Sequence, residues 1–296
     1  MRTRLLVTVL TAALLHPVTA SAWGFAAHQL VMRRAIELLP PELTPLFEKH
    51  REEVVLRVVD PDLWRNVGWA DDPNHFVDFG AKEFGDYPFT GLPRDLGAAI
   101  EKFGQPTLDR NGRLPWRLGE IFGQLRRAFE GFARQSPYAI SDVVLFSAVA
   151  SHYVQDAHQP FHATDDYDGQ KAGQRGIHAR FERDLIERFA SRLRLTPPSV
   201  VPMKSPSDRI WDILLASHRL VAPVLEADRA AADGREFYDD AYFEAFFVKT
   251  QPILEQQLGA AASATAALIT GAWIEAGRPA ISLVPARPVQ KIERGK

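Results

Sequence analysis

Histidines and carboxylates recur at short, regular spacings in the middle of the chain. His152 and Asp156 are four residues apart, and His178 and Glu182 repeat that spacing. On a helix, residues four apart project from one face, so each pair can act on one centre. Imidazole and carboxylate are the ligand types expected of zinc in an open catalytic site. The two pairs therefore predict a metal centre, although either pair alone would more often be a surface contact.

A further histidine follows the first pair across a proline. Pro160 lacks the amide hydrogen that a helix interior needs, so the helix that carries His152 and Asp156 should end just before it. His162 then lies in the turn, where it can reach a neighbouring metal ion. The run from His152 to His162 is therefore predicted to serve more than one ion.

The elements that must position these residues are predicted to be helices. Apolar residues recur with helical spacing over most of the chain, and no alternating strand pattern persists beyond a few residues. Thr44 before Pro45, and Ser136 before Pro137, have the composition of helix starts, with Thr44 as an N-cap. Further helices are expected over 28–39, 177–193, 239–257 and 259–276, and loops over 61–92 and 163–177. The fold class that follows is all-α, a single-domain multi-helix bundle.

The first 22 residues are predicted to be a signal peptide. Two arginines precede an apolar run over residues 5–15, and residues 20–22 (Ala-Ser-Ala) form a small-residue cleavage motif. The run is short for a membrane span, although an N-terminal anchor helix is the alternative reading. Cleavage would make Trp23 the first residue of a secreted or periplasmic protein.

Bulk composition narrows the class of protein further. The chain has 296 residues, a formal charge of -2 and no cysteine, so it offers neither disulfides nor a general polycation for nucleic acid. Residues 258–274 are uncharged but rich in alanine, which favours a buried bundle helix over a membrane span. We expect a catalytic domain over 23–285, a basic tail over 286–296, a monomer, and no integral membrane span after signal removal.

Taken together, the motifs resemble those of the family that joins zinc-dependent bacterial phospholipase C and the single-strand-specific S1/P1 nucleases. Members begin with tryptophan after signal removal, as Trp23 would here, with His28 following. They carry an aspartate ahead of a histidine, matched by Asp60 or Asp62 ahead of His75. They also carry His-x3-Asp-x5-His and a final His-x3-Asp/Glu, which are the two motifs described above.

The resemblance extends from residue 23 to about residue 279 and implies three zinc ions. The ligands implied for the first ion are His75, His152, Asp156 and one aspartate of the Asp60/Asp62 pair. Those implied for the second ion are His162, His178 and Glu182. Those implied for the third ion are His28, the α-amino group and carbonyl oxygen of Trp23, and Asp156 as a bridge. A free amine has a pKa of about 7.7–8.0, so its neutral form can bind zinc.

Two aspartates compete for one of these positions. Asp62 and Asp60 stand 13 and 15 residues before His75, and Asp62 is preferred because Arg65 follows it in the related Asp-x-x-Arg pattern. In the phospholipases of the family the matching aspartate has been considered a general base as well as a ligand. Both aspartates are therefore candidate catalytic residues.

The resemblance also implies hydrolysis of phosphodiesters, with zinc activating water and offsetting charge on the phosphate. Glu182 and the absence of cysteine are like the phospholipase branch, which makes phospholipid the first expected substrate. The five-residue step from Trp23 to His28 is like the nuclease branch, which would cleave single-stranded DNA or RNA. A non-catalytic zinc-binding scaffold is the third reading. Candidate substrate contacts are Arg65, Phe76, Phe161, Tyr167 and Arg180, where either arginine would equally suit a surface salt bridge.

Overall fold

The computed structural model describes residues 23–204 and 206–287, which form helices and loops without a strand. This confirms the predicted all-α class. The predicted signal peptide and most of the predicted basic tail lie outside the described residues. In chain order the α-helices are α1 (Phe25–Ile36), α2 (Thr44–Lys49), α3 (Arg51–Arg57), α4 (Asp60–Trp64), α5 (Leu96–Phe103), α6 (Gln105–Asn111), α7 (Leu114–Ala133), α8 (Ala139–Ala157), α9 (Ile177–Ala179), α10 (Leu185–Phe189), α11 (Ser207–His218), α12 (Val221–Ala232) and α13 (Asp240–Glu275). Short 3-10 turns are η1 (Arg65–Val67), η2 (Asp72–Asn74), η3 (Pro160–His162) and η5 (Ala190–Arg192), and η4 (Arg180–Asp184) is a π-helix.

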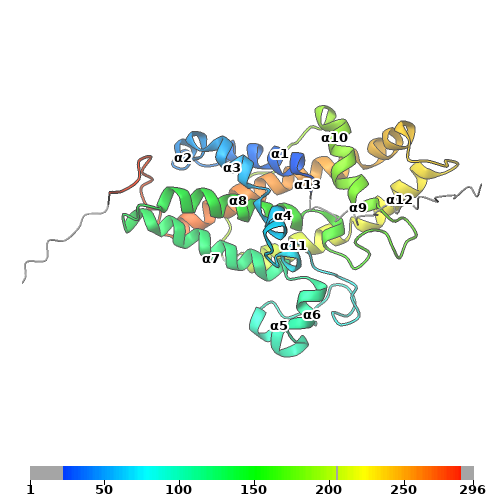
Figure 1. Ribbon diagram of the computed structural model, residues 1–296, viewed down its shortest axis with the longest axis horizontal. Helices are drawn as coiled ribbons and strands as arrows, with labels where there is room; N and C mark the ends of the chain where they lie inside the picture. The colour runs from blue at the N-terminus through cyan, green and yellow to red at the C-terminus, as the bar shows by residue number, and fades with distance from the viewer. Residues whose placement is uncertain (1–22, 205, 288–296) are drawn as a thin grey trace, which may run out of the picture.

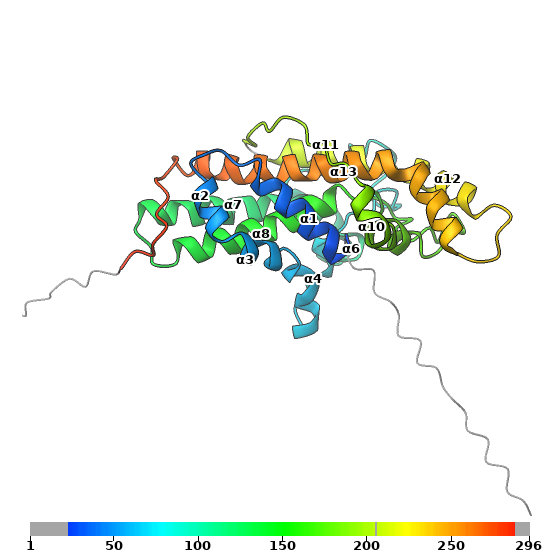
Figure 2. The ribbon, with the colours of Figure 1, turned by 90° about the horizontal axis from the view of Figure 1, so that it is seen from above.

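Three long helices, α7, α8 and α13, lie side by side and form the body of the bundle (Figure 1). α13 runs along most of the length of the described molecule (Figure 2). The first helix, α1, packs against α13, α3 and α8. The bundle thus brings residues near the start of the chain against residues from its middle.

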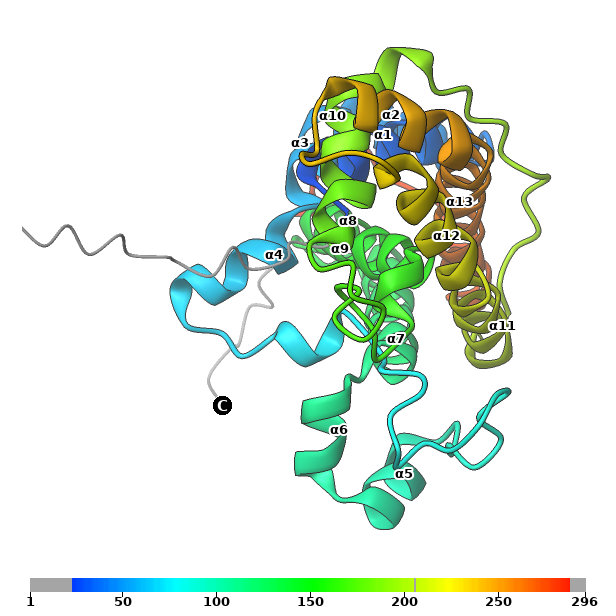
Figure 3. The same ribbon diagram turned by 90° about the vertical axis from the view of Figure 1, so that its right-hand side faces the viewer.

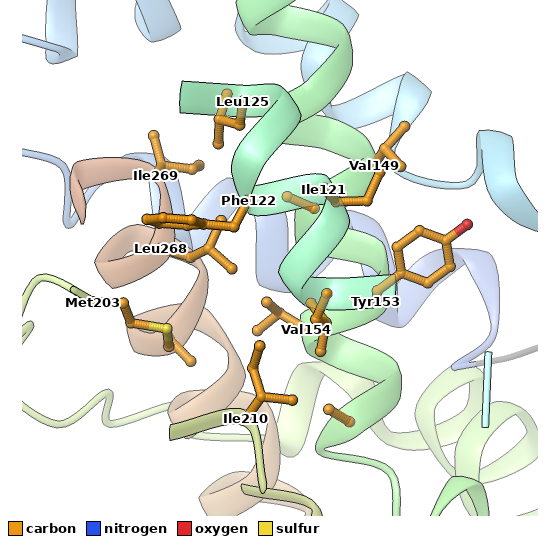
Figure 4. Packing of buried hydrophobic residues seen from close by; sticks show 14 of the residues in the cluster. Ile121, Phe122, Leu125, Val149, Tyr153, Val154, Met203, Ile210, Leu268 and Ile269 are labelled. Atoms are coloured by element: carbon orange, nitrogen blue, oxygen red, sulfur yellow. The ribbon is translucent and has the colours of Figure 1, made fainter. Parts of the chain in front are cut away.

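The apolar faces of the long helices meet in a core that Figure 4 shows from close by. Phe122 of α7 lies beside Leu268 and Ile269 of α13, and Val149 of α8 packs into the same cluster. Burying a side chain of this size stabilises the fold by about 1.5–3 kcal/mol. This packing holds α8 in place along its whole length.

The last helix differs from the prediction, because residues predicted as two helices form one. Gly259 does not end a helix; a Cβ there would lie 3.3 Å from the backbone of Thr196, so the glycine permits close approach of that segment. Pro252 lies inside the helix. The carbonyl that it leaves without an intrahelical donor belongs to Val248, an exposed residue.

α13 is also long and apolar enough, by length and composition, to cross a membrane. However, 89% of its most apolar 18-residue window is buried inside the molecule. Core helices of a bundle have this property, which agrees with the buried helix predicted for residues 258–274.

Three further predictions need correction: the start of one helix, the continuity of another and the extent of a loop. Thr44 is the first residue of α2 and does not cap it; its hydroxyl donates to the carbonyl of Pro40 at 3.0 Å. The predicted helix over 177–193 is interrupted by the π-helix η4. The predicted loop over 61–92 includes α4, η1 and η2.

Helices α5 and α6 project from the bundle beside the loop that carries His75 (Figure 3). Gly112, between α6 and α7, has a φ of +88°, and a Cβ there would lie 2.1 Å from the carbonyl oxygen of Phe76. No other residue fits at this point, because any side chain would collide with that backbone. The glycine therefore lets the α6–α7 junction press directly against the His75 loop.

Candidate metal centre

The predicted ligand side chains gather in one buried region of the bundle. They come from α1, α4, the residue after η2, α8, η3, α9 and η4. Their ligand atoms form three groups, each within 4.8 Å: His28 with His152 and Asp156, Asp62 with His75 and His152, and His162 with His178 and Glu182. All of these residues are buried.

Asp156 lies at the centre of this region. One carboxylate oxygen is 3.0 Å from Nδ1 of His75 and 3.2 Å from Nε2 of His152. The other is 3.7 Å from Nε2 of His28 and 3.9 Å from Nδ1 of His162. Asp156 is fully buried, so its carboxylate faces these four histidines and no solvent.

The two competing aspartates have different surroundings. Asp62 is buried, with Oδ1 at 3.9 Å from Nδ1 of His75 and 3.8 Å from Nε2 of His152. Asp60 is half-buried and forms an ion pair with Arg57 at 3.1 Å. The structure thus brings Asp62 to the histidines and leaves Asp60 on the outer side of α4.

The third group forms where η3 meets the turn from α9 into η4. Nε2 of His178 is 2.8 Å from Oε2 of Glu182 and 3.1 Å from Nε2 of His162. Gln159 donates to the same carboxylate at 2.8 Å and, through its own Oε1, accepts from the amide of Phe161. The helix α8 ends at Ala157, as Pro160 predicted, and the turn after it presents His162.

The loop that carries His75 is fixed by backbone hydrogen bonds on both sides. The amide of Val77 donates to the carbonyl of His162 at 2.8 Å, and Nδ1 of His162 lies 2.6 Å from the carbonyl of His75. On the other side, the amide of Leu114 donates to the carbonyl of Phe76 at 3.1 Å. Two of the three ligand groups are therefore joined directly to each other.

Three buried polar atoms of the described ligand groups have no hydrogen-bond partner: Nε2 of His28, Oδ1 of Asp156 and Nδ1 of His178. The first two face each other across 3.7 Å. Ligand atoms about 2 Å from a tetrahedral zinc ion stand about 3.3 Å apart, close to the separations in all three groups. A metal ion between such atoms would satisfy them, so the residues fit the predicted metal.

The outer nitrogen of most of these histidines is held by the protein. Nδ1 of His152 lies 2.9 Å from the carbonyl of Val58, and Nδ1 of His28 lies 3.0 Å from Oε1 of Gln155. A histidine that binds a metal through one nitrogen usually donates through the other. The remaining nitrogens of His28 and His152 thus face the cluster as ligands would.

Without a metal, the group must balance its own charges. Burial alone would lower the pKa of His75, but hydrogen bonds to Asp156 and Asp71 raise it to about 10. Burial and the neighbouring His152 hold the pKa of His28 well below its usual value. Burial opposes ionisation of Asp156, but the charges of His152 and His162 lower its pKa well below the usual range. The same centre thus contains one histidine with a raised pKa and one with a lowered pKa.

Trp23 is fully buried, and its indole donates to the carbonyl of Gln155 at 2.7 Å. Gln155 also contacts His28 through its side chain. The residue next to Asp156 therefore anchors both the start of the predicted mature chain and the first predicted ligand. Binding of metal by the amine of Trp23 stays a prediction.

A cavity of about 500 Å³ opens onto the ligand groups. Asp62, His75, His162 and His178 line it. Four of the predicted substrate contacts line it as well: Arg65, Phe76, Phe161 and Tyr167. The remaining lining residues are Asp72, Asp78 and Arg110, which the sequence did not single out.

Asp78 has the least usual environment of these three. Its Oδ1 is buried and has no hydrogen-bond partner, and burial together with the charge of Asp165 raises the pKa of Asp78 to about 7. It stands three residues after His75 in the same loop. Its proximity to His75 was the one signal in the sequence that could have identified Asp78 as a site residue, and proximity along the chain does not show whether a side chain is buried.

Arg180, the fifth predicted substrate contact, does not line the cavity. Its guanidinium donates hydrogen bonds to Asp228 at 3.1 Å, to the hydroxyl of Tyr242 at 3.0 Å and to the carbonyl of Arg175 at 2.8 Å. The side chain is buried and ties the turn around η4 to α12 and α13. Its position fits the salt-bridge reading, with a buried carboxylate in place of a surface one.

No family model matches the chain, and no curated protein is similar enough to be matched. The structure itself shows an all-helical protein with buried groups of histidine and carboxylate that could hold metal ions. Family membership therefore stays a prediction that rests on the motifs.

Proposed function

We propose that this protein is a zinc-dependent phosphodiester hydrolase. The observation that carries the proposal is the pair of orphaned atoms, Nε2 of His28 and Oδ1 of Asp156, in one of three adjoining ligand groups, of which the other two contribute residues to the wall of a cavity. Zinc in such a site acts as a Lewis acid that activates water near neutral pH and offsets charge on phosphate oxygens. Three ions are expected, as the motifs imply.

The cavity offers further groups that suit a phosphodiester. Arg65 and Arg110 both line it, and a guanidinium can bind two phosphate oxygens at once. Asp62 lies beside His75 and opens onto the same space, where a carboxylate could orient an attacking water. These residues would hold the substrate and direct the attack, while the buried histidines hold the metal.

The substrate we place first is phospholipid, with release of the head group. Phe76, Phe161 and Tyr167 give the cavity an apolar wall, which suits the lipid part of such a molecule. A single-stranded nucleic acid is the second candidate, because the same aromatic side chains can stack on bases. Asp78 also lines the cavity, where its carboxyl could form a hydrogen bond with the edge of a base.

The test uses protein exported and processed in its host, so that its N-terminus is found by sequencing. We expect it to begin at Trp23, to contain about three zinc ions, and to lose activity with a chelator and regain it with zinc. Initial rates on phosphatidylcholine and on single-stranded DNA, at equal zinc and salt, then identify the substrate. A rate on DNA at least about tenfold higher would reverse the order of the two candidates. Purified protein without bound transition metal would contradict the proposal. Protein that binds zinc but hydrolyses neither ester would instead support a non-catalytic zinc-binding scaffold.

A further inference from the structure

A buried carboxylate outside the three ligand groups lies against the outer side of His75. Oδ2 of Asp71 is 3.2 Å from Nε2 of His75 and accepts a hydrogen bond from the hydroxyl of Tyr153 at 2.5 Å. Oδ1 of Asp71 accepts from Nδ2 of the Asn74 side chain at 2.8 Å. Asp71 is 8% exposed, and both of its oxygens are occupied by side chains of the protein. It is therefore held in one place rather than free to bind an ion itself.

This contact determines which nitrogen of His75 faces the centre. With Nε2 donating to Asp71, Nδ1 points inward, 3.0 Å from Asp156 and 3.0 Å from Nε2 of His152. An outer carboxylate of this kind fixes the tautomer and orientation of a metal-binding imidazole and makes its other nitrogen more basic.

His75 differs in this respect from three other histidines of the centre. The outer nitrogens of His28, His152 and His162 face neutral oxygens, those of Gln155, Val58 and His75 respectively. The carboxylate at the outer nitrogen of His75 thus distinguishes it from these three histidines. His75 also stands on a loop, whereas His28 and His152 stand on long helices. A loop histidine has more need of a side chain that fixes its ring.

The support for Asp71 extends one residue further. Tyr153 follows His152 on α8, and the guanidinium of Arg117 on α7 lies 5.4 Å from the centre of its ring. A cation over an aromatic face is attracted to it, so Arg117 helps to fix the ring that donates to Asp71. Successive contacts thus connect Arg117 to Tyr153, Tyr153 to Asp71 and Asp71 to His75.

We propose that Asp71, fixed by Tyr153 and Asn74, is a positioning residue that orients His75 and strengthens the metal site shared with Asp62 and His152. The inference rests on the proposed function only in that zinc must bind there. Loss of such an outer partner commonly weakens metal affinity by about 10–100-fold.

The test counts zinc ions retained by the folded, mature protein at a series of buffered free-zinc concentrations. We expect Asp71→Asn to need about 10–100-fold more free zinc to fill one of the three sites, with the other two changed little. Tyr153→Phe, which removes only the hydroxyl, should show a smaller shift of the same site. Asp228→Asn is the matched control, because it also removes a buried, hydrogen-bonded carboxylate, but at a place where no metal is expected.

The outcomes separate the two proposals. A wild-type protein that binds no zinc would overturn the proposed function. A wild-type protein with three ions, whose affinities match those of Asp71→Asn, would overturn the positioning role alone. Should Asp71→Asn fail to fold, Tyr153→Phe decides, and an unshifted zinc titration of that variant counts against the inference.

Discussion

Two buried polar networks lie within the same bundle, and they differ in how completely the protein satisfies them. In the first, Asp228 accepts hydrogen bonds from Arg180, Gln174 and Tyr242, and none of these four side chains has an unpartnered buried polar atom. In the second, around Asp156, two fully buried atoms face each other without a partner. Buried polar groups are normally paired, so the difference separates a network that completes itself from one that an ion could complete.

The difference also shows in the charges. Arg180 and Asp228 are a cation and an anion with ordinary partners, so their network is neutral by itself. The Asp156 region holds several histidines against few carboxylates, and burial drives the pKa of His162 down to about 3. A histidine kept neutral in this way can bind a cation without first losing a proton, whereas His75, whose pKa is raised, would have to release one.

The largest expected effect comes from removing the carboxylate at the middle of the second network. Asp156→Ala should lower phosphodiesterase activity by roughly 10³-fold or more, about 4 kcal/mol, because two metal sites lose a shared ligand. The purified variant should carry fewer zinc ions than the wild type by metal analysis. A variant with full zinc content and near-normal rates would show that Asp156, like Asp228, has a structural role and does not bind metal.

The second effect concerns the network around Asp228, in which the protein pairs every buried polar group. Asp228→Asn should lower the free energy of unfolding by about 3–5 kcal/mol, since it leaves the buried Arg180 without its counter-charge. Denaturant unfolding would measure this loss, and metal analysis should still find the wild-type zinc content. Loss of zinc from this variant, with the fold intact, would mean that the two networks are coupled.

The third effect tests the two aspartates of α4. Asp62→Asn should reduce activity by about 10²-fold through weaker zinc binding, because its carboxylate lies with His75 and His152. Asp60→Asn, a change of the same size two residues away, removes a partly exposed ion pair and should alter stability by about 1 kcal/mol or less. Rates and zinc counts for the two purified variants would decide between them, and the reverse pattern would move the ligand role to Asp60.

The smallest effect is one of pH, at Asp78. The folded pKa of about 7 lies above the unfolded value near 3.8, so the folded state binds the proton more tightly. The stability from this group is present at pH 4 and is lost as the pH rises through 7. Asp78→Asn, measured in the metal-free protein, should therefore raise the melting temperature at pH 8 and change it little at pH 4. An equal shift at both pH values would contradict the raised pKa.

Short spacings were the part of this centre that could be predicted from the residues alone. His152 with Asp156, and His178 with Glu182, lie four apart and do meet. His28 and Asp62 were predicted only through the resemblance, because a lone histidine or aspartate shows nothing of its distant partners. The outer contact of Asp71 was not predicted, since it depends on Tyr153, which is 82 residues away.

The same limit explains the errors and omissions elsewhere. Arg180 stands between two ligand residues and suggested a phosphate contact, but its partner Asp228 lies 48 residues later. Residues 239–257 and 259–276 were predicted as two helices, and the close contact of Gly259 with Thr196 became visible only when the chain was folded. Local patterns predict local geometry, while the partners of a buried charge or a glycine follow from the packing of distant segments.

The wide spacing of the ligands along the chain has a consequence for the order of events during biogenesis. His75 and His152 are 77 residues apart, and closing an unfolded loop of that length costs about 4 kcal/mol in chain entropy before any contact forms. An unfolded chain therefore offers zinc only the short His-x3-Asp and His-x3-Glu pairs, which bind weakly by comparison. If the centre holds zinc, the three ligand groups would therefore form only once the bundle has brought these distant segments together.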